Sequence, residues 1–126
     1  MVLVHDDKVL AMKQWLSPGK WSLPGGGLHV GESMAGGAAR ELYEETSLQL
    51  DPRQLQHVGR ATYRKYGHTF DYQIFVARVG SDSVRAQRIE VSELVWLRPG
   101  ELRANNSSPD TLRSLQMVQQ KTTLLQ

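Results

Sequence analysis

The sequence predicts a single domain of mixed α and β structure, and three observations support this. A chain of 126 residues is long enough to bury one sizeable core but short for two. Residues 33–46 and 108–121 combine helix-capping residues with helical spacing, and apolar, β-rich segments lie between them. Hydrophobic residues make up 40% of the chain and charged residues 22%, as in a globular protein. We therefore expect one domain over residues 1–126.

Composition excludes several classes of site. The chain has no cysteine, so it forms neither disulfides nor thiolate metal sites, which fits a reducing cytoplasm. No apolar run approaches the roughly 18 residues that span a bilayer, and the N-terminus lacks a signal-peptide pattern, so we expect no membrane partner. A net charge of +2 suits an anionic substrate but is too small to indicate nucleic-acid binding.

The first elements are read from turn residues. Residues 1–13 predict a β-hairpin, with turn chemistry at Asp6-Asp7. Residues 14–20 contain Ser-Pro-Gly and predict a loop. Residues 21–23 predict a short strand that leads into a glycine turn.

Helix-capping residues predict two helices. Ser33 is the expected N-cap of a helix that runs to about residue 46, with a small-residue face for packing on a sheet. The closing helix has Ser108 as N-cap and Pro109 at its first position. An apolar stripe at helical spacing predicts that this helix packs on the core; its members are Leu112, Leu115 and Val118.

Three strands are expected between the helices. Residues 55–63 and 69–79 predict a strand pair, in which Ile74, Val76 and Val79 are candidate core residues. Residues 93–97 predict a further strand. A turn or single helical turn should follow it.

A cluster of carboxylates is the main chemical signal. Glu41, Glu44 and Glu45 lie three and four residues apart, so they share one face of the first predicted helix. Like charges at this spacing repel by roughly 0.2–0.5 kcal/mol per pair, so the cluster favours a bound cation. Hard divalent ions prefer oxygen ligands, and Mg²⁺ is commonly held by carboxylates together with substrate phosphates. The pattern predicts a Mg²⁺ or Mn²⁺ site for phosphate chemistry.

The stretch from Gly25 to Leu48 resembles the Nudix box, G-x5-E-x7-R-E-U-x-E-E-x-G-U, in which U is a bulky aliphatic residue. The fixed positions that agree are Gly26, Glu32, Arg40, Glu41, Leu42, Glu44, Glu45 and Leu48. Ser47 stands where the pattern has its second glycine, at a cap position that often needs a positive φ. We expect Ser47 to adopt that conformation at roughly 1 kcal/mol, or the helix to end in another way. No metal ligand is lost.

The resemblance implies a Nudix fold, an α/β/α sandwich in which a mixed β-sheet lies between helices and a loop-helix-loop borders the active cleft. Nudix enzymes hydrolyse a diphosphate linked to another group, usually one containing a nucleoside. The partner implied is therefore a small-molecule nucleotide or nucleotide derivative, and a homodimer is possible because many relatives dimerise.

The resemblance also implies roles for individual residues. The metal ligands expected are Glu41, Glu44 and Glu45, with the backbone at Gly25 close by. Arg40 is expected to pair with a box glutamate, Glu32 or Glu41, and to fix its orientation. The general base is either a box glutamate or an acid on a later segment, where Glu90 and Glu93 are available and Glu93 is preferred. The expected catalytic residues are Glu44, Glu41, Arg40 and Glu93.

Side chains outside the box would select the substrate. Arg64, Tyr66 and Phe70 are our candidates, because aromatic rings stack on bases and arginine pairs with phosphate. The leading hypothesis is a pyrophosphohydrolase acting on nucleoside triphosphates or related nucleotides. The alternatives are a nucleotide-sugar or dinucleoside-polyphosphate pyrophosphatase, and a non-catalytic module that binds a nucleotide.

Overall fold

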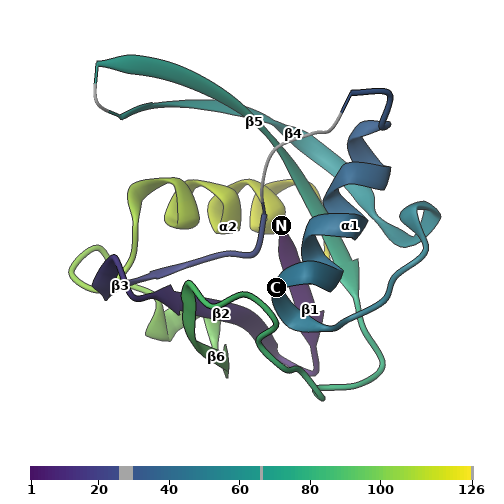
Figure 1. Ribbon diagram of the computed structural model, residues 1–126, viewed down its shortest axis with the longest axis horizontal. Coiled ribbons are helices and arrows are strands. Elements are labelled where there is room, and N and C mark those ends of the chain that lie inside the picture. Colours follow the sequence, from purple (N-terminus) through teal and green to yellow (C-terminus); the bar gives the residue numbers. More distant parts are fainter. Residues whose placement is uncertain (26–29, 66, 126) are drawn as a thin grey trace.

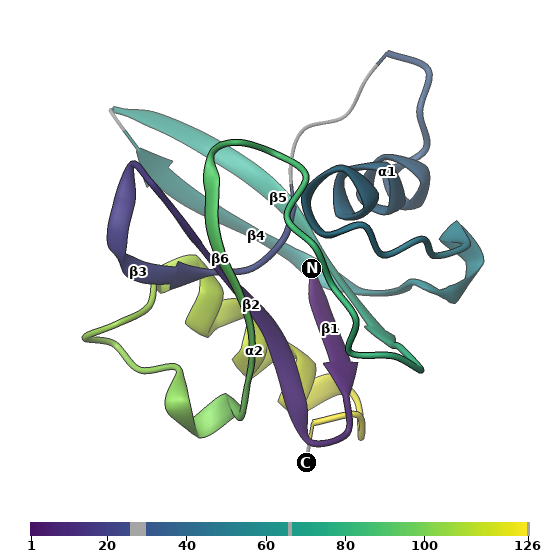
Figure 2. The ribbon, with the colours of Figure 1, turned by 60° about the horizontal axis from the view of Figure 1, so that its bottom comes forward.

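The computed structural model describes residues 1–25, 30–65 and 67–125, with the backbone alone at residues 63, 65 and 70. Within these ranges a six-stranded mixed sheet carries one α-helix on each face (Figures 1 and 2). The strands are β1 (Val2–His5), β2 (Lys8–Gln14), β3 (Ser17–Ser22), β4 (Gln56–Lys65), β5 (His68–Arg78) and β6 (Val91–Leu97), and the helices are α1 (Met34–Thr46) and α2 (Pro109–Lys121). The predicted α+β sandwich is confirmed.

The sheet is mixed because one of its pairings is parallel. The strand order is β3-β2-β1-β5-β4, and β6 pairs with β2 outside this path. Strand β1 runs parallel to β5, whereas β1–β2, β2–β3, β2–β6 and β4–β5 are antiparallel. The β4–β5 hairpin extends beyond the helices at its tip (Figure 1).

Alternation along the central strands builds two cores, one on each face of the sheet. In β1, Val2 and Val4 belong to the core that contains Leu115 and Val118 of α2. Leu3, between them, belongs to the core that contains Leu42 of α1. The predicted core residues Ile74, Val76 and Val79 are buried, and so is most of the α2 stripe. Both helices are therefore fixed by apolar contacts to the same central strands.

The predicted loop at residues 14–20 is wrong. Gln14 ends β2, and residues 17–22 form the edge strand β3, which pairs with β2. Pro18 is tolerated because an edge strand has a backbone side that needs no hydrogen-bonded N–H. The predicted strand at 21–23 is the end of β3, and the strand predicted at 93–97 begins two residues earlier, at Val91.

The helix caps follow the sequence signals. Ser33 precedes α1 and its hydroxyl accepts a hydrogen bond from the N–H of Gly36 at 3.0 Å. Ser47 ends α1 in the left-handed region, with φ 66°, and donates its N–H to Tyr43. Ser108 and Pro109 begin α2 as predicted. In the part of the chain that the structure describes, neither helix is long and apolar enough to cross a membrane.

Candidate active site

The three predicted carboxylates lie together on α1, and two of them are nearly buried. Glu41 is 5% exposed and Glu45 is 3% exposed, while the side chain of Glu44 is 35% exposed. Ala39 and Leu42 of the same helix pack on the sheet, which fixes the direction of the carboxylate face. The N–H of Gly25 donates to Glu45 Oε1 at 2.9 Å, so this carboxylate connects the helix to the preceding loop.

Arg40 holds the carboxylates from one side. Its Nε and Nη2 atoms donate to the two oxygens of Glu32 at 2.7 and 3.1 Å. Its Nη1 atom donates to Glu41 Oε1 at 2.8 Å and to Glu44 Oε2 at 3.1 Å. The predicted pairing of Arg40 with a box glutamate is confirmed. The guanidinium contacts both predicted partners and Glu44 as well.

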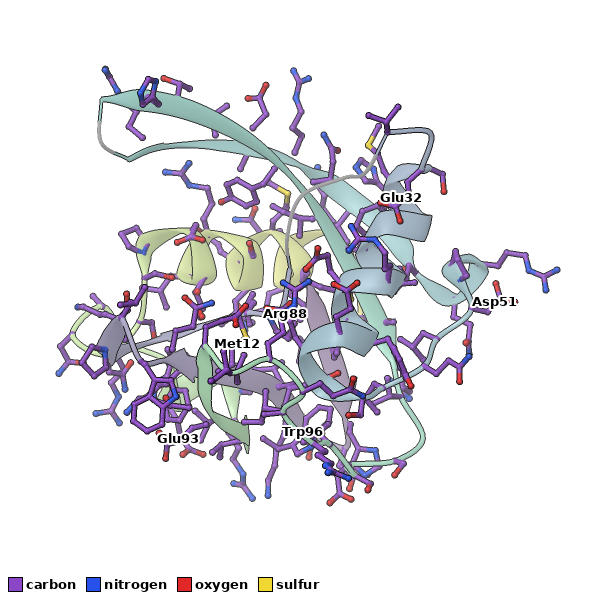
Figure 3. All side chains as sticks on the ribbon, viewed as in Figure 1. Met12, Glu32, Asp51, Arg88, Glu93 and Trp96 are labelled. Carbon is purple, nitrogen blue, oxygen red and sulfur yellow. The ribbon has the colours of Figure 1, made fainter. Side chains whose placement is uncertain are left out.

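Arg88 approaches the same carboxylates from the segment between β5 and β6, and sequence reasoning missed it. Its Nη1 atom lies 3.1 Å from Glu41 Oε2, and its Nη2 atom donates to Glu44 Oε2. Figure 3 shows Arg88 beside α1. The repulsion expected among the glutamates was a signal that a cation lies against them, but it did not identify this arginine.

Charge and burial shift the pKa values within this cluster. Burial raises the pKa of Glu45 from 4.5 to about 7, with the Glu41 carboxylate adding to the effect and the Gly25 N–H opposing it. For Glu44, desolvation is outweighed by hydrogen bonds from Arg40 and Arg88, which lower its pKa. The hydrogen bond to Glu32 is the main cause that raises the pKa of Arg40. For Arg88, desolvation is outweighed by Glu41 and Glu44, which raise its pKa. The buried carboxylates are thus held in an environment that favours a nearby cation.

The donor chemistry of this cluster fits a hard divalent ion, although the ligand geometry is not assembled. Glu41 Oε2 is buried and accepts no hydrogen bond from the residues that the structure describes. Its contact with Arg88 Nη1, at 3.1 Å, is an ion pair. Carboxylate oxygens are the ligands that Mg²⁺ and Mn²⁺ prefer. Within residues 1–25, 30–65 and 67–125, no three His, Asp or Glu side chains converge as a metal-binding group. The arginines occupy oxygens that an ion would use.

The later acidic residues lie at different distances from the cluster. Glu93 is on β6, where its carboxylate is 3.9 Å from Lys13 Nζ on β2 and half exposed. Glu90 is 3.9 Å from Arg88 Nη1, so it is linked to the carboxylates through that arginine. In Figure 3, Glu93 lies near β6 while Arg88 lies against α1.

A groove of about 1230 Å³ lies next to this cluster. Gly25 and Ala38 line it on the side of α1, and Arg64 and Tyr72 line it on the side of the hairpin. The predicted substrate residue Arg64 is therefore a groove residue. Tyr66 lies outside the described residues, and the side chain of Phe70 does too. The N-terminal turn of α2 contributes Pro109, Asp110 and Arg113 to the groove.

Comparison with known proteins gives the family from sequence and the fold from structure. The family model described as NUDIX domain matches residues 1–118. An uncharacterized Nudix hydrolase of Pseudomonas aeruginosa is 35% identical over 79% of this chain, and a MutT-like protein of Streptomyces ambofaciens is 31% identical over 81%. The chain spans 60% and 62% of the lengths of these two relatives.

Solved structures share the fold at low sequence identity. A Nudix hydrolase from Nitrosomonas europaea is 23% identical with a TM-score of 0.81, covering 98% of this chain and 88% of its own. The Nudix domain of Shewanella oneidensis NrtR, complexed with ADP ribose, is 20% identical with a TM-score of 0.80, covering 94% and 82%. A bifunctional NMN adenylyltransferase/ADP ribose pyrophosphatase from Francisella tularensis, complexed with AMP and a Mn ion, is 20% identical with a TM-score of 0.72, covering 94% and 39%.

Proposed function

Because the chain belongs to the Nudix family, we propose that it is a pyrophosphohydrolase dependent on Mg²⁺ or Mn²⁺. Its substrate would be a nucleoside diphosphate linked to another group, most simply a nucleoside triphosphate. The observation that carries this proposal is the position of Glu41, Glu44 and Glu45 on one face of α1, with two of the three nearly buried. Burying repelling carboxylates costs free energy, which a bound cation offsets.

In this proposal, the residues of the α1 cluster have two roles, metal binding and the orientation of the metal ligands. Glu41, Glu44 and Glu45 hold the divalent ion, with the Gly25 backbone close by. The bound ion neutralises phosphate charge and lowers the pKa of water. Arg40, fixed by its two bonds to Glu32, orients Glu41 and Glu44.

The reaction also needs a general base that takes a proton from the attacking water. The candidates are Glu41, Glu44, Glu90 and Glu93. The position of Glu44 supports its choice, because it is the most exposed glutamate of the α1 cluster. Glu93 is the later acid that the sequence favoured, and its pairing with Lys13 makes it the weaker candidate.

The groove supports a substrate of nucleotide size. Its volume of about 1230 Å³ is not smaller than the roughly 300–1,000 Å³ typical of small-molecule sites. Arg64 at its wall is a ready partner for phosphate. The ADP ribose and AMP bound to structural neighbours are in line with such a substrate.

A substrate panel tests the proposal. The protein is incubated with Mg²⁺ and deoxynucleoside triphosphates, NADH, ADP-ribose, nucleotide sugars, diadenosine polyphosphates or 5′-triphosphate RNA, and the phosphate products are quantified. We expect turnover of at least one compound, reduced by about 100-fold or more in Glu44→Gln if Glu44 is the base. Glu93→Gln is the matched control. A loss in Glu93→Gln alone would move the role to Glu93.

Two other outcomes of the panel decide between the alternatives. Preferred turnover of a nucleotide sugar or a dinucleoside polyphosphate would replace the triphosphate as substrate. Tight binding of one compound with no hydrolysis of any would instead favour a non-catalytic binding module. A homodimer and a cytoplasmic location stay predictions, to be tested by analytical ultracentrifugation and by imaging of a tagged protein.

A further inference from the structure

Arg88 contacts two carboxylates that the proposed metal site requires. Its guanidinium lies against Glu41 Oε2 and Glu44 Oε2, and 33% of the side chain is exposed. Glu90 is its third acidic neighbour, at 3.9 Å. An arginine on a surface loop usually contributes little through such pairs, because solvent screens them. Here one partner is almost buried, so the pair is stronger than a surface pair.

The segment that carries Arg88 is anchored to the end of α1. The hydroxyl of Ser47 donates to the carbonyl of Arg85 at 2.8 Å and accepts from the amide of Gln87 at 2.7 Å. The N–H of Arg85 donates to the carbonyl of Thr46 at 2.9 Å. A glycine at position 47 would lack the hydroxyl bonds. The residue that departs from the family pattern therefore helps to position the Arg88 segment.

The two arginines of the cluster are held differently. Arg40 has a bidentate contact with Glu32, which keeps it in place whatever Glu41 and Glu44 bind. Arg88 has its two shortest contacts on Glu41 and Glu44 themselves. A divalent ion on these oxygens would repel Arg88, while the hydrogen bonds to the Thr46 carbonyl and the Ser47 hydroxyl would keep its segment nearby. The guanidinium would then need another anion within reach of a long side chain.

We propose that Arg88 is a phosphate-binding residue of the active site, which pairs with Glu41 and Glu44 before metal binds and with a substrate phosphate afterwards. This inference rests on the proposed function. The planar guanidinium has several N–H donors, which fit phosphate oxygens as well as carboxylate oxygens. Arg88 can therefore replace its carboxylate partners by a phosphate and keep the same kind of hydrogen bond. Arg88 would thus compete with the metal when substrate is absent and assist substrate binding when metal is present.

Two titrations test this without relying on turnover. The first follows Mn²⁺ binding to the metal-free protein by electron paramagnetic resonance. We expect Arg88→Ala to bind Mn²⁺ about tenfold more tightly than wild type, because the guanidinium that competes for Glu41 and Glu44 is gone. The second measures binding of imidodiphosphate, a non-hydrolysable pyrophosphate analogue, to the Mn²⁺-loaded protein. There Arg88→Ala should bind about tenfold more weakly.

Arg85→Ala is the matched control, because it removes the same charge from the same segment at an exposed side chain. It should stay within about twofold of wild type in both titrations. Arg88→Lys keeps the positive charge but loses the planar guanidinium that can bind two oxygens at once. It should therefore leave Mn²⁺ binding near wild type and weaken imidodiphosphate binding. This variant also serves if Arg88→Ala fails to fold.

The outcomes separate the two proposals. If wild type binds Mn²⁺ and Arg88→Ala matches Arg85→Ala in either titration, the role of Arg88 is overturned while the proposed function stands. If Arg88→Ala does not fold, Arg88→Lys takes its place. The role of Arg88 is then overturned if Arg88→Lys binds imidodiphosphate as tightly as Arg85→Ala does. If wild type binds no Mn²⁺, the proposed function fails and the role of Arg88 fails with it.

Discussion

The two helices have the same length, 13 residues, and cover opposite faces of one sheet, yet they present opposite chemistry. Helix α2 buries Leu115 and Val118 against the sheet, and its exposed positions after Pro109 are polar. Helix α1 buries Leu42 but also Glu41 and Glu45, which are expensive groups to remove from water. The α2 face is built for stability. The α1 face holds charge in place at a cost to stability.

The difference explains why Arg40 and Arg88 both lie against the carboxylates of α1. A buried carboxylate needs a partner, and in α1 the partners come from the same helix at Arg40 and from a distant segment at Arg88. The apolar side chains of α2 pack against the sheet and need no charged partner. We therefore expect α2 substitutions to change the free energy of unfolding, and α1 substitutions to change ion and phosphate binding.

The largest expected effect on stability is at α2. Leu115 is 4% exposed within the core, so Leu115→Ala should lower the free energy of unfolding by about 2–5 kcal/mol through lost burial and a cavity. Urea denaturation measures this. Gln116→Ala, at an exposed position of the same helix, should stay within about 0.5 kcal/mol of wild type. Folded Leu115→Ala should keep wild-type Mn²⁺ affinity, and a large loss would show that the two faces are not independent.

A smaller effect should appear in the pH dependence of the metal-free protein. Burial raises the pKa of Glu45 to about 7, above its usual 4.5. A carboxyl with a raised folded-state pKa contributes stability that is present below pH 4.5 and lost as the pH rises through 7. The contribution of Glu45 therefore falls between these values. Mg²⁺ favours the ionised carboxylate, so it should stabilise the protein more at pH 8 than at pH 5.

Glu45→Gln isolates this contribution, since its amide does not titrate. The Met1 amino group, whose pKa burial lowers to about 6, acts in the opposite direction and is present in both proteins. Urea denaturation in EDTA at several pH values gives the difference between wild type and Glu45→Gln. Wild type should lose stability relative to the variant as the pH rises. A difference that stays constant with pH would contradict a raised pKa of Glu45.

Local patterns were enough to predict most of this comparison from sequence. The α2 stripe and both N-caps depend on residues within a few positions of each other, and the carboxylate face follows from helical spacing. The strand β3 was missed because Ser17, Pro18 and Gly19 are turn residues by local preference. Pairing with β2 overrides that preference.

Arg88 was missed for a related reason. It lies 44 residues from Glu44, in a segment without helical or strand periodicity. Only the fold brings it to α1, and only Ser47 marks the place where its segment is anchored. A cluster of carboxylates predicts that a positive charge is needed beside it, but not which residue supplies that charge.

The smallest effect concerns Ser47 and separates two opposing contributions. Its φ of 66° is strained for a residue with a Cβ, so Ser47→Gly should gain roughly 1 kcal/mol from relief of strain. The same variant loses two hydroxyl hydrogen bonds, each contributing about 0.5–1.5 kcal/mol. The net change in the free energy of unfolding should be small, within about 1–2 kcal/mol.

Ser47→Ala resolves the two contributions because it removes the hydroxyl and keeps the strain. It should be less stable than Ser47→Gly by about 1 kcal/mol, measured by urea denaturation. Both variants free the segment that carries Arg88, so both should bind Mn²⁺ more tightly than wild type, in the same direction as Arg88→Ala but by a smaller factor. If Ser47→Ala and Ser47→Gly keep wild-type Mn²⁺ affinity, the hydroxyl bonds of Ser47 do not position Arg88, and the proposed link between the α1 cap and the carboxylate face is wrong.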